Sequence, residues 1–307
     1  MNPEALLTAQ TEWFARVDRA LPEPTPPDPG EVITAALPDG RRVAGVVSRV
    51  AAGPGSLNSL WSARQTWELF PLVGDTGGAG MDALLRSLRR WLDKLGSVGD
   101  DTACLVTWPS RDAEATRVFL DHGLQALTVV AVRPPTPIPP PAMTVTVRRA
   151  TPGDIDAVAR LAMAELGYSA LVGAAVIRPD AGHIRRAALA GRITRGEAIW
   201  LAERDGVELA LAETAVVPAS PMLKIGRQLF AGRWGYVNCL SVLPGARRSG
   251  IGQQLMAVVH AEWAAQRVVG HYLHYNPANP LSSVFWPRQG YRPLWTQWEV
   301  RPVTALR

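Results

Sequence analysis

A short basic turn with two glycines joins an apolar segment to an amphipathic one in residues 242–256. Residues 234–242 are apolar and rich in residues typical of β-strands, and Pro244 and Gly245 end that strand. Beyond the turn, apolar residues recur at the spacing of a helix face, namely Ile251, Leu255, Val258, Val259 and Trp263. The sequence therefore predicts a strand that passes through the turn directly into a helix.

The turn has the composition of an anion-binding site. Backbone amides at the start of a helix point outward and carry partial positive charge. Arg247 and Arg248 add full charges, and Gly250 and Gly252 leave the backbone open to a phosphate. Basic glycine turns also serve as plain connections, but the strand and the helix around this one favour a pyrophosphate site.

A second pattern follows. Residues 271–275 predict another strand, and Asn279-x-x-Ser282-x-x-Phe285-Trp286-x-x-x-Gly290-Tyr291 predicts a last helix with a glycine-aromatic exit. Together with the spacing Arg247-x-x-Gly250-x-Gly252, this order resembles the GCN5-related N-acetyltransferase (GNAT) superfamily over roughly residues 143–301. The resemblance implies an α/β fold with a mixed, mostly antiparallel sheet flanked by helices. It also implies transfer of an acyl group from CoA to an amine.

The chain is long enough for two domains, and a proline-rich segment divides it. Its 307 residues are about twice the length of a typical domain, and 47% of them are hydrophobic. Prolines dominate residues 134–142, which favours an extended spacer over a helix or a central strand. We therefore expect an N-terminal domain at residues 1–133, a linker at 134–142 and a C-terminal domain at 143–307.

Both halves predict a similar order of elements. In the C-terminal half, strands are expected at 144–149, 198–203, 208–216, 234–242 and 271–275, with Asp205-Gly206 as a hairpin turn. The N-terminal half predicts helices at 4–21 and 81–95 and strands at 31–36, 42–47, 67–73 and 104–108. Asp112 to Gly123 and Asn279 to Gly290 share a spacing of 11 residues. This repeat indicates two tandem GNAT-like domains.

The two copies differ at the turn. Asp75 stands in the N-terminal half where the C-terminal half has Arg247. A carboxylate beside a pyrophosphate is repulsive by about 1 to 4 kcal/mol, which indicates a degenerate copy. Gly77, Gly78 and Gly80 still leave the backbone accessible. The N-terminal half is therefore interpreted either as structural or as holding a CoA without turnover.

Composition disfavours several other classes of protein. The net charge is +5, but Lys94 and Lys224 are the only lysines and no long basic run with aromatics occurs, which argues against nucleic acid. No run of about 18 apolar residues predicts a membrane span, and the first residues lack the pattern of a signal peptide. Cys104 and Cys239 have no metal-like spacing and fit reduced thiols of a cytoplasmic protein. The sequence suggests no metal and does not indicate an oligomeric state.

The resemblance implies acetyl-CoA as the acyl donor. In the family, the motif strand diverges from its neighbour and pairs with the pantetheine arm, while the turn amides take the pyrophosphate. Asn279 would hold the cofactor near its thiol. The cofactor-binding residues expected on this basis are Cys239, Leu240, Val242, Arg247, Arg248, Ser249, Gly250, Ile251, Gly252 and Asn279.

The catalytic residues are less clearly indicated. The family often uses a tyrosine four residues before the last-helix glycine to protonate the leaving thiolate, and here that position is Trp286. An indole is no practical proton donor, so Tyr291, Tyr275 or water would take its place. Glu213 lies on a strand expected to border the acceptor and is the candidate base, although it also fits a solvated hairpin face.

The acceptor is expected to be an amine of a small molecule or a peptide. Residues 221–230 are mixed basic and apolar, and fit either a lid over the acceptor or a surface loop. An acyl-CoA-binding sensor or scaffold with weak catalysis is the alternative function, suggested by Trp286 and Asp75. A dinucleotide-binding oxidoreductase is disfavoured, because residues 77–80 lack the βαβ fingerprint.

Overall fold

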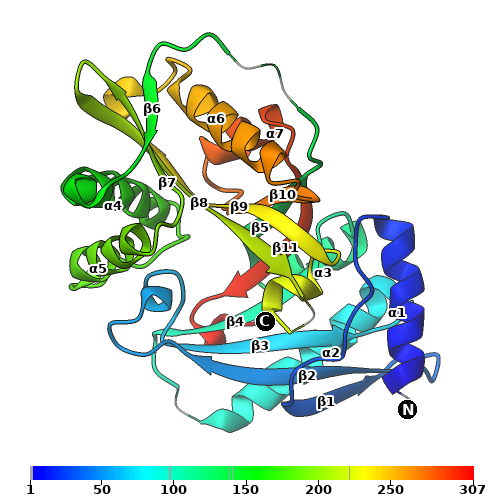
Figure 1. Ribbon diagram of the computed structural model, residues 1–307. Helices are drawn as coiled ribbons and strands as arrows, with labels where there is room; N and C mark the ends of the chain where they lie inside the picture. Colours follow the sequence, from blue (N-terminus) through cyan, green and yellow to red (C-terminus); the bar gives the residue numbers. More distant parts are fainter. Residues whose placement is uncertain (1–2, 97, 138, 140, 221) are drawn as a thin grey trace.

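The computed structural model describes residues 3–96, 98–137, 139, 141–220 and 222–307 (Figure 1). The N-terminal half forms α1 (Pro3–Val17), β1 (Glu31–Ala36), β2 (Arg42–Ala51), the 3-10 helix η1 (Leu57–Leu60), β3 (Gln65–Leu72), α2 (Gly77–Leu92), β4 (Thr102–Pro109), α3 (Ala113–Asp121) and β5 (Gln125–Arg133). The C-terminal half forms β6 (Thr146–Arg149), α4 (Ile155–Leu171), α5 (Ala181–Thr194), β7 (Ile199–Arg204), β8 (Val207–Ala219), β9 (Gly232–Val242), α6 (Ile251–Ala265), β10 (Gly270–Tyr275), α7 (Ser282–Arg288) and β11 (Arg292–Val300).

Local sequence signals account for most of these elements. The predicted hairpin turn is confirmed, since Asp205 and Gly206 have φ angles of 52° and 75°. The glycine run of the N-terminal half belongs to α2, which begins at Gly77, four residues before the helix predicted at 81–95. Glycine is needed there because a Cβ at Gly80 would lie 1.8 Å from Thr76 Oγ1. β5 follows α3 as the implied last strand of its half, although no local pattern singled it out.

The eleven strands of the described residues form one continuous sheet. Their order is β1-β2-β3-β4-β11-β5-β10-β9-β8-β7-β6. Only the pairs β3–β4 and β9–β10 are parallel, and every other neighbouring pair in the described part of the chain is antiparallel. The predicted mixed, mostly antiparallel sheet flanked by helices is therefore confirmed.

The two halves exchange their last strands. β11, from the end of the C-terminal half, lies between β4 and β5 of the N-terminal half and pairs with both. β5 in turn lies between β11 and β10, and pairs with β10 from His271–Arg133 to Tyr275–Val129. The halves defined by the linker therefore share one sheet and complete each other at its centre, as the crossing strands in Figure 1 show.

In the C-terminal half, the sheet is buried on both faces. Alternate residues of β8 point to opposite layers: Ala210 and Ala212 pack in the cluster that includes α6, whereas Leu211 packs with α4 and α5. In β9 the alternation is interrupted: Val237 lies on the α6 side and Cys239 on the α4 side, because a register shift at Asn238 separates them. No helix within the described ranges combines the length and the apolar character that a membrane span requires.

Candidate functional site

The parallel pair β9–β10 opens into a gap. The two strands pair from Trp234–Gly270 to Val237–Leu273 and no further. Beyond that point β9 continues along β8 and β10 continues along β5. The register of β9 against β8 shifts at Asn238, as in a β-bulge. Residues 238–242 therefore border an opening in the sheet, which is the divergence that the resemblance implied.

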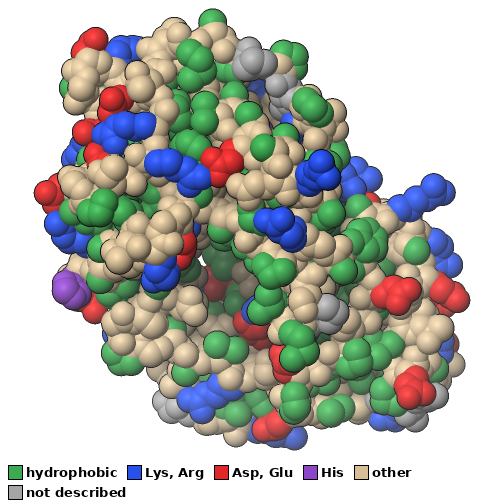
Figure 2. All heavy atoms as spheres, in the orientation of Figure 1, with side chains coloured by type: hydrophobic (Ala, Val, Ile, Leu, Met, Phe, Trp, Pro, Cys, Tyr) green, Lys and Arg blue, Asp and Glu red, His purple; other side chains and the backbone are tan. Residues whose placement is uncertain are grey.

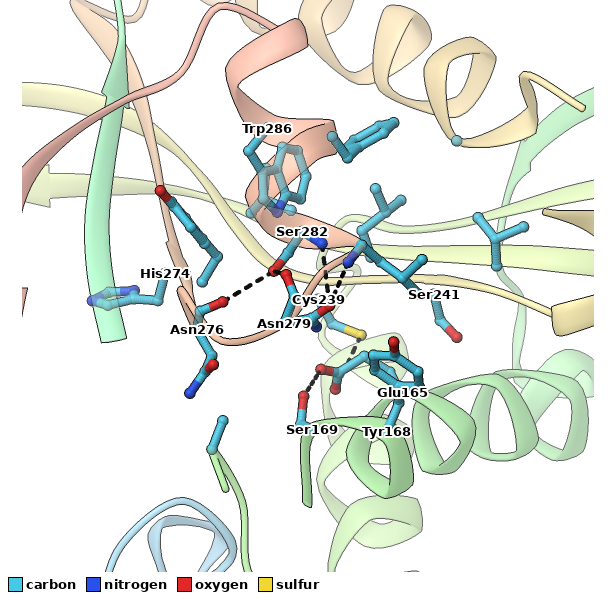
Figure 3. Close-up of a pocket in the computed structure, with 18 of the residues that line it drawn as sticks. Glu165, Tyr168, Ser169, Cys239, Ser241, His274, Asn276, Asn279, Ser282 and Trp286 are labelled. Carbon is cyan, nitrogen blue, oxygen red and sulfur yellow. Dashed lines mark hydrogen bonds between the residues drawn. The ribbon is translucent and has the colours of Figure 1, made fainter. Parts of the chain in front are cut away.

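A cavity of about 770 Å³ fills this opening. Figure 3 shows Glu165, Tyr168 and Ser169 of α4 on one side of it, with Ser282 and Trp286 of α7 across from them. The surface is hollowed between α4–α5 and the N-terminal half (Figure 2). The expected cofactor-binding residues that line the cavity are Cys239, Leu240, Val242, Arg247, Arg248, Gly250, Ile251, Gly252 and Asn279.

The tenth residue, Ser249, is not among the described lining residues and instead shapes the turn. Its hydroxyl donates to the Ala246 carbonyl at 2.6 Å. The backbone bends at Arg248 and Gly250, whose φ angles are 66° and 79°. The helical hydrogen bonds of α6 start with the Gln254 amide, which donates to the Gly250 carbonyl at 3.0 Å. The amides just before it have no acceptor within the helix, which suits an anion.

Arg247 and Gly252 shape the wall beside the turn. The Arg247 guanidinium lies 5.1 Å from the ring centre of Tyr168, and its Nε donates to the Val242 carbonyl at 3.1 Å. A Cβ at Gly252 would lie 3.4 Å from Phe285 and 3.6 Å from Val242. A single methyl group therefore fits at Gly252, whereas a large side chain would fill the space next to the turn.

The corresponding turn of the N-terminal half is already capped by a carboxylate of the chain. The Gly78 amide donates to Glu114 Oε2 at 3.0 Å, and a Cβ at Gly77 would lie 2.5 Å from the same oxygen. Asp75 lies 3.6 Å from the Arg41 guanidinium. A negative group thus occupies the positive end of α2, which supports the structural interpretation of this half.

Glu165 is the functional candidate that the sequence analysis missed. Its carboxylate lines the cavity, accepts a hydrogen bond from Ser169 Oγ at 2.5 Å and lies 3.9 Å from Cys239 Sγ (Figure 3). Burial raises its pKa, although Ser169 and Arg185 act in the opposite direction. The signal was present in the sequence, because Glu165 shares a helix face with the buried residues Val158, Leu161, Ala162, Leu166 and Ser169.

Two aromatic side chains at the same cavity, Trp286 and Tyr275, are relevant to the question of which group could act as the general acid. Trp286 lines the cavity and is also buried in the core cluster around α6, where it meets Tyr291 edge to face. Tyr275, at the end of β10, lines the cavity and is half-buried, and burial raises its pKa. Its phenol therefore stays protonated at neutral pH.

The two residues proposed as catalytic do not line the cavity in the described structure. Glu213 has no exposed surface, and its carboxylate pairs with Arg185 and with Arg192, the latter at 2.6 Å. Asn238 Nδ2 also donates to it at 3.0 Å. With its oxygens held in this way, Glu213 stabilises the β8–α5 contact and the bulge of β9. Its carboxylate is therefore not available to act as the base.

Tyr291 is likewise buried away from the cavity. Its hydroxyl is 3.0 Å from His260 Nε2, and burial raises its pKa strongly. His260 stacks on His271 with ring centres 5.0 Å apart, and Arg133 Nη1 lies 2.9 Å from His271 Nδ1. His274 points to the other face of β10 and lines the cavity, whereas His271 packs against His260.

The stacked histidines should make folding stability depend on pH. Burial, together with neighbouring charge, lowers the pKa of both His260 and His271 from 6.5 to about 3. The unfolded chain takes up protons below pH 6.5 that the folded chain does not, so stability falls as the pH drops from 6.5 toward 3. The expected loss is on the order of 2 kcal/mol per histidine at pH 5. Urea unfolding of His271→Phe should show a smaller loss between pH 7 and pH 5 than the wild type. Equal losses would contradict the assignment.

The segment from Met222 to Phe230 lies over the N-terminal half. Lys224 Nζ donates to both oxygens of Glu68, at 2.7 and 2.8 Å, and Arg227 pairs with Asp28 at 2.6 Å. These residues border a second cavity of about 230 Å³ where β3 and β4 diverge. Neither Lys224 nor Arg227 is among the described residues lining the larger cavity, so the lid interpretation is not supported. Pro221 lies outside the described residues.

Comparison with known proteins agrees with this geometry. Residues 161–291 match the family model described as Acetyltransferase (GNAT) family. No curated protein sequence matches the chain. A GCN5-related N-acetyltransferase from Sphaerobacter thermophilus aligns with a TM-score of 0.58 and 14% identity, covering 98% of this chain and 93% of its own. A GNAT-family acetyltransferase from Colwellia psychrerythraea aligns with a TM-score of 0.52 and 11% identity, covering 96% of both chains.

Residues 161–291, in the C-terminal half, thus match a domain of the GNAT acetyltransferase family. The two structural matches extend this fold to nearly the whole chain, including the N-terminal half. At such low identity they show the fold alone.

Proposed function

We propose that the protein transfers an acetyl group from acetyl-CoA to an amine at the cavity between β9 and β10. The observation that carries the proposal is the joining of three features in one cavity. These are the unpaired stretch of β9, the basic turn before α6 and the carboxylate of Glu165. Acyl transfer requires a positioned donor and a neutral amine. The strand and the turn would position the donor, and the carboxylate would accept a proton from the amine.

The basic turn and β9 would hold the donor. Amides at the start of α6 suit the pyrophosphate, and Arg247 and Arg248 add charge. The backbone of residues 239–242 is available to pair with the pantetheine arm, because β10 has already diverged. Asn279 lines the same wall, but its Oδ1 accepts the Leu281 and Ser282 amides at 2.9 and 3.2 Å. Its first role is therefore to cap α7.

Glu165 is the proposed general base. A carboxylate with a raised pKa accepts a proton from an ammonium more readily than an ordinary one, and a water molecule can relay that proton. The neutral amine then attacks the thioester carbonyl, a C–N bond forms and the C–S bond breaks. The nitrogen loses its second proton to the tyrosinate that remains once the Tyr275 phenol has protonated the sulfur. Tyr275 is placed to return a proton to the leaving sulfur, since its phenol is protonated and lines the cavity.

An acyl-CoA-binding protein without turnover is the alternative. The observation that favours it is Trp286, which is buried where the family often has a proton-donating tyrosine. The two functions share the donor site and differ in turnover. Release of CoA in the presence of amines separates them.

Acetyl-CoA binding should be lost on Gly252→Trp. The indole would fill the space beside the turn, next to Phe285 and Val242. Native mass spectrometry with acetyl-CoA should show one bound cofactor in the wild type and none in the variant. Gly245→Trp is the matched control, because Gly245 belongs to the same turn but a Cβ there meets no atom within 4 Å.

Each outcome of this titration has a distinct meaning. Loss in Gly252→Trp with binding retained in Gly245→Trp places the donor site at the basic turn. A second cofactor that survives Gly252→Trp would show that the N-terminal turn still binds, in spite of Glu114. Absence of binding to the wild type would overturn the proposed function.

A further inference from the structure

The N-terminal half reaches the large cavity through the loop that carries η1. Trp61, directly after η1, lines the cavity with a half-buried indole. The preceding residue, Leu60, has no exposed surface and packs into a cluster with Leu166, Ala175, Ala181 and Ile184 of the C-terminal half. The loop is therefore docked between α4 and α5, and Trp61 is the residue that it presents to the cavity.

Polar contacts clamp this loop on both sides of Trp61. The Val176 amide donates to the Leu60 carbonyl at 2.8 Å. Arg178 donates to the Ser59 carbonyl at 3.1 Å and to the Ser62 carbonyl at 3.3 Å. The same guanidinium pairs with Asp101 at 2.6 Å, and its hydrogen bond lowers the pKa of that carboxyl. A loop held by three such hydrogen bonds keeps its indole in place before any ligand arrives.

Trp61 lines the same cavity as Glu165 and packs against residues of α4, the helix that carries Glu165. The indole packs against the cluster around Leu166, the residue next to Glu165 on α4. Glu165 carries the one carboxylate among the described lining residues, whereas Arg247, Arg248 and Arg288 supply cations elsewhere in the wall. The indole thus offers an apolar surface in the same cavity as the carboxylate that would accept a proton from the amine.

We propose that Trp61 is a specificity-determining residue for the acceptor. Its indole is the platform for an apolar or aromatic group of the acceptor, such as the ring of an arylalkylamine. This inference rests on the proposed function, because it takes Glu165 as the partner of the reacting amine. It also gives the N-terminal half a part in substrate selection, although its own turn is capped by Glu114.

Acceptor profiles of Trp61 variants test the proposal. Acetyl transfer is measured as CoA release with 2-phenylethylamine, tyramine, ethylamine and ethanolamine at saturating acetyl-CoA. Trp61→Ala should lower kcat/KM for the two arylalkylamines by about tenfold or more, mainly through KM, and for the two short amines by less than about threefold. Trp61→Phe should retain most of the preference. The KM for acetyl-CoA should not change in either variant.

Two further variants separate a substrate contact from a general loss of structure. Leu57→Ala is the control, because Leu57 belongs to η1 but is not among the described lining residues. It should leave all four amines unchanged. Arg178→Met releases the loop and should reproduce the selective loss seen with Trp61→Ala. Thermal unfolding of each variant identifies any that fails to fold.

The results also distinguish this inference from the proposed function. Equal loss for all four amines in Trp61→Ala, or no loss, overturns the inference and leaves acetyl transfer standing. The same holds if the wild type does not prefer arylalkylamines over the short amines. If the wild type binds acetyl-CoA but acetylates none of them, the proposed function fails on this panel, and the role of Trp61 fails with it.

Discussion

A chain of residues 143–307 alone should form no folded monomer and should not bind acetyl-CoA. It would lack β5, which pairs with β10 on one side and with β11 on the other. Without β5, the edge of β10 is left open and β11 has no neighbour within its own half. Leu127 and Thr128 of β5 also form part of the cavity wall. Size-exclusion chromatography with light scattering, circular dichroism and acetyl-CoA titration would measure the effect.

Co-expression of residues 1–142 with 143–307 is the control. The two pieces should assemble into a 1:1 complex that binds acetyl-CoA, because together they supply both exchanged strands. If residues 143–307 give a stable monomer with the acetyl-CoA affinity of the full chain, the exchange of strands does not contribute to folding in the way described here.

Glu165→Gln should lower kcat by a factor of about 10² to 10⁴ at neutral pH with little change in acetyl-CoA affinity. The amide keeps the size of the side chain and its contact with Ser169, but it cannot accept a proton. The base must be ionised to act, so wild-type kcat/KM should rise with pH through the pKa of Glu165, which burial raises. The variant should lose this acid limb. Steady-state rates from pH 5 to pH 9 would show both effects.

Two further substitutions on α4, at Asp156 and Ser169, make the test of Glu165 more specific. Asp156→Asn is the matched control, since Asp156 lies on α4 but is exposed and pairs with Arg186. It should leave the rate unchanged. Ser169→Ala removes a hydrogen bond that lowers the pKa of Glu165, so the acid limb should move to higher pH. An unchanged pH profile in Glu165→Gln would show that another group accepts the proton.

Local patterns were sufficient for most of the elements and for the prediction of a donor-binding turn. Alternation and helical spacing located the strands and helices, and the basic turn carries its own signal in Arg247, Gly250 and Gly252. These features depend on residues close together in sequence. Nine of the ten cofactor-binding residues expected from the sequence line one cavity for that reason.

The sequence did not indicate that the two catalytic candidates lie outside the described cavity lining, because their positions depend on distant partners. Glu213 alternates as a strand residue should, but α5 places Arg185 and Arg192 against its carboxylate. Tyr291 follows the expected glycine, but its hydroxyl meets His260 from α6. No local pattern contains such partners. The position of Glu165 on an apolar helix face was visible in the sequence and could have been used.

The exchange of strands between the two halves could not be predicted from the sequence either. No local pattern singled out β5, and the sequences of β5 and β11 do not state which neighbours each strand will have. The proline-rich linker suggested two separate domains, yet the strands on its two sides belong to one sheet. Trp61 was missed for the same reason, because its neighbours come from α4 and α5 of the other half.

The position of β11 also bears on how the chain is synthesised. β4 ends at Pro109, and the strand that covers its second edge begins only at Arg292, roughly 180 residues later. At a translation rate of about 5 to 20 residues per second, that edge stays uncovered for roughly 10 to 40 s while the ribosome makes the rest. An uncovered strand edge is a template for aggregation. The N-terminal half therefore has to remain incomplete and protected during translation.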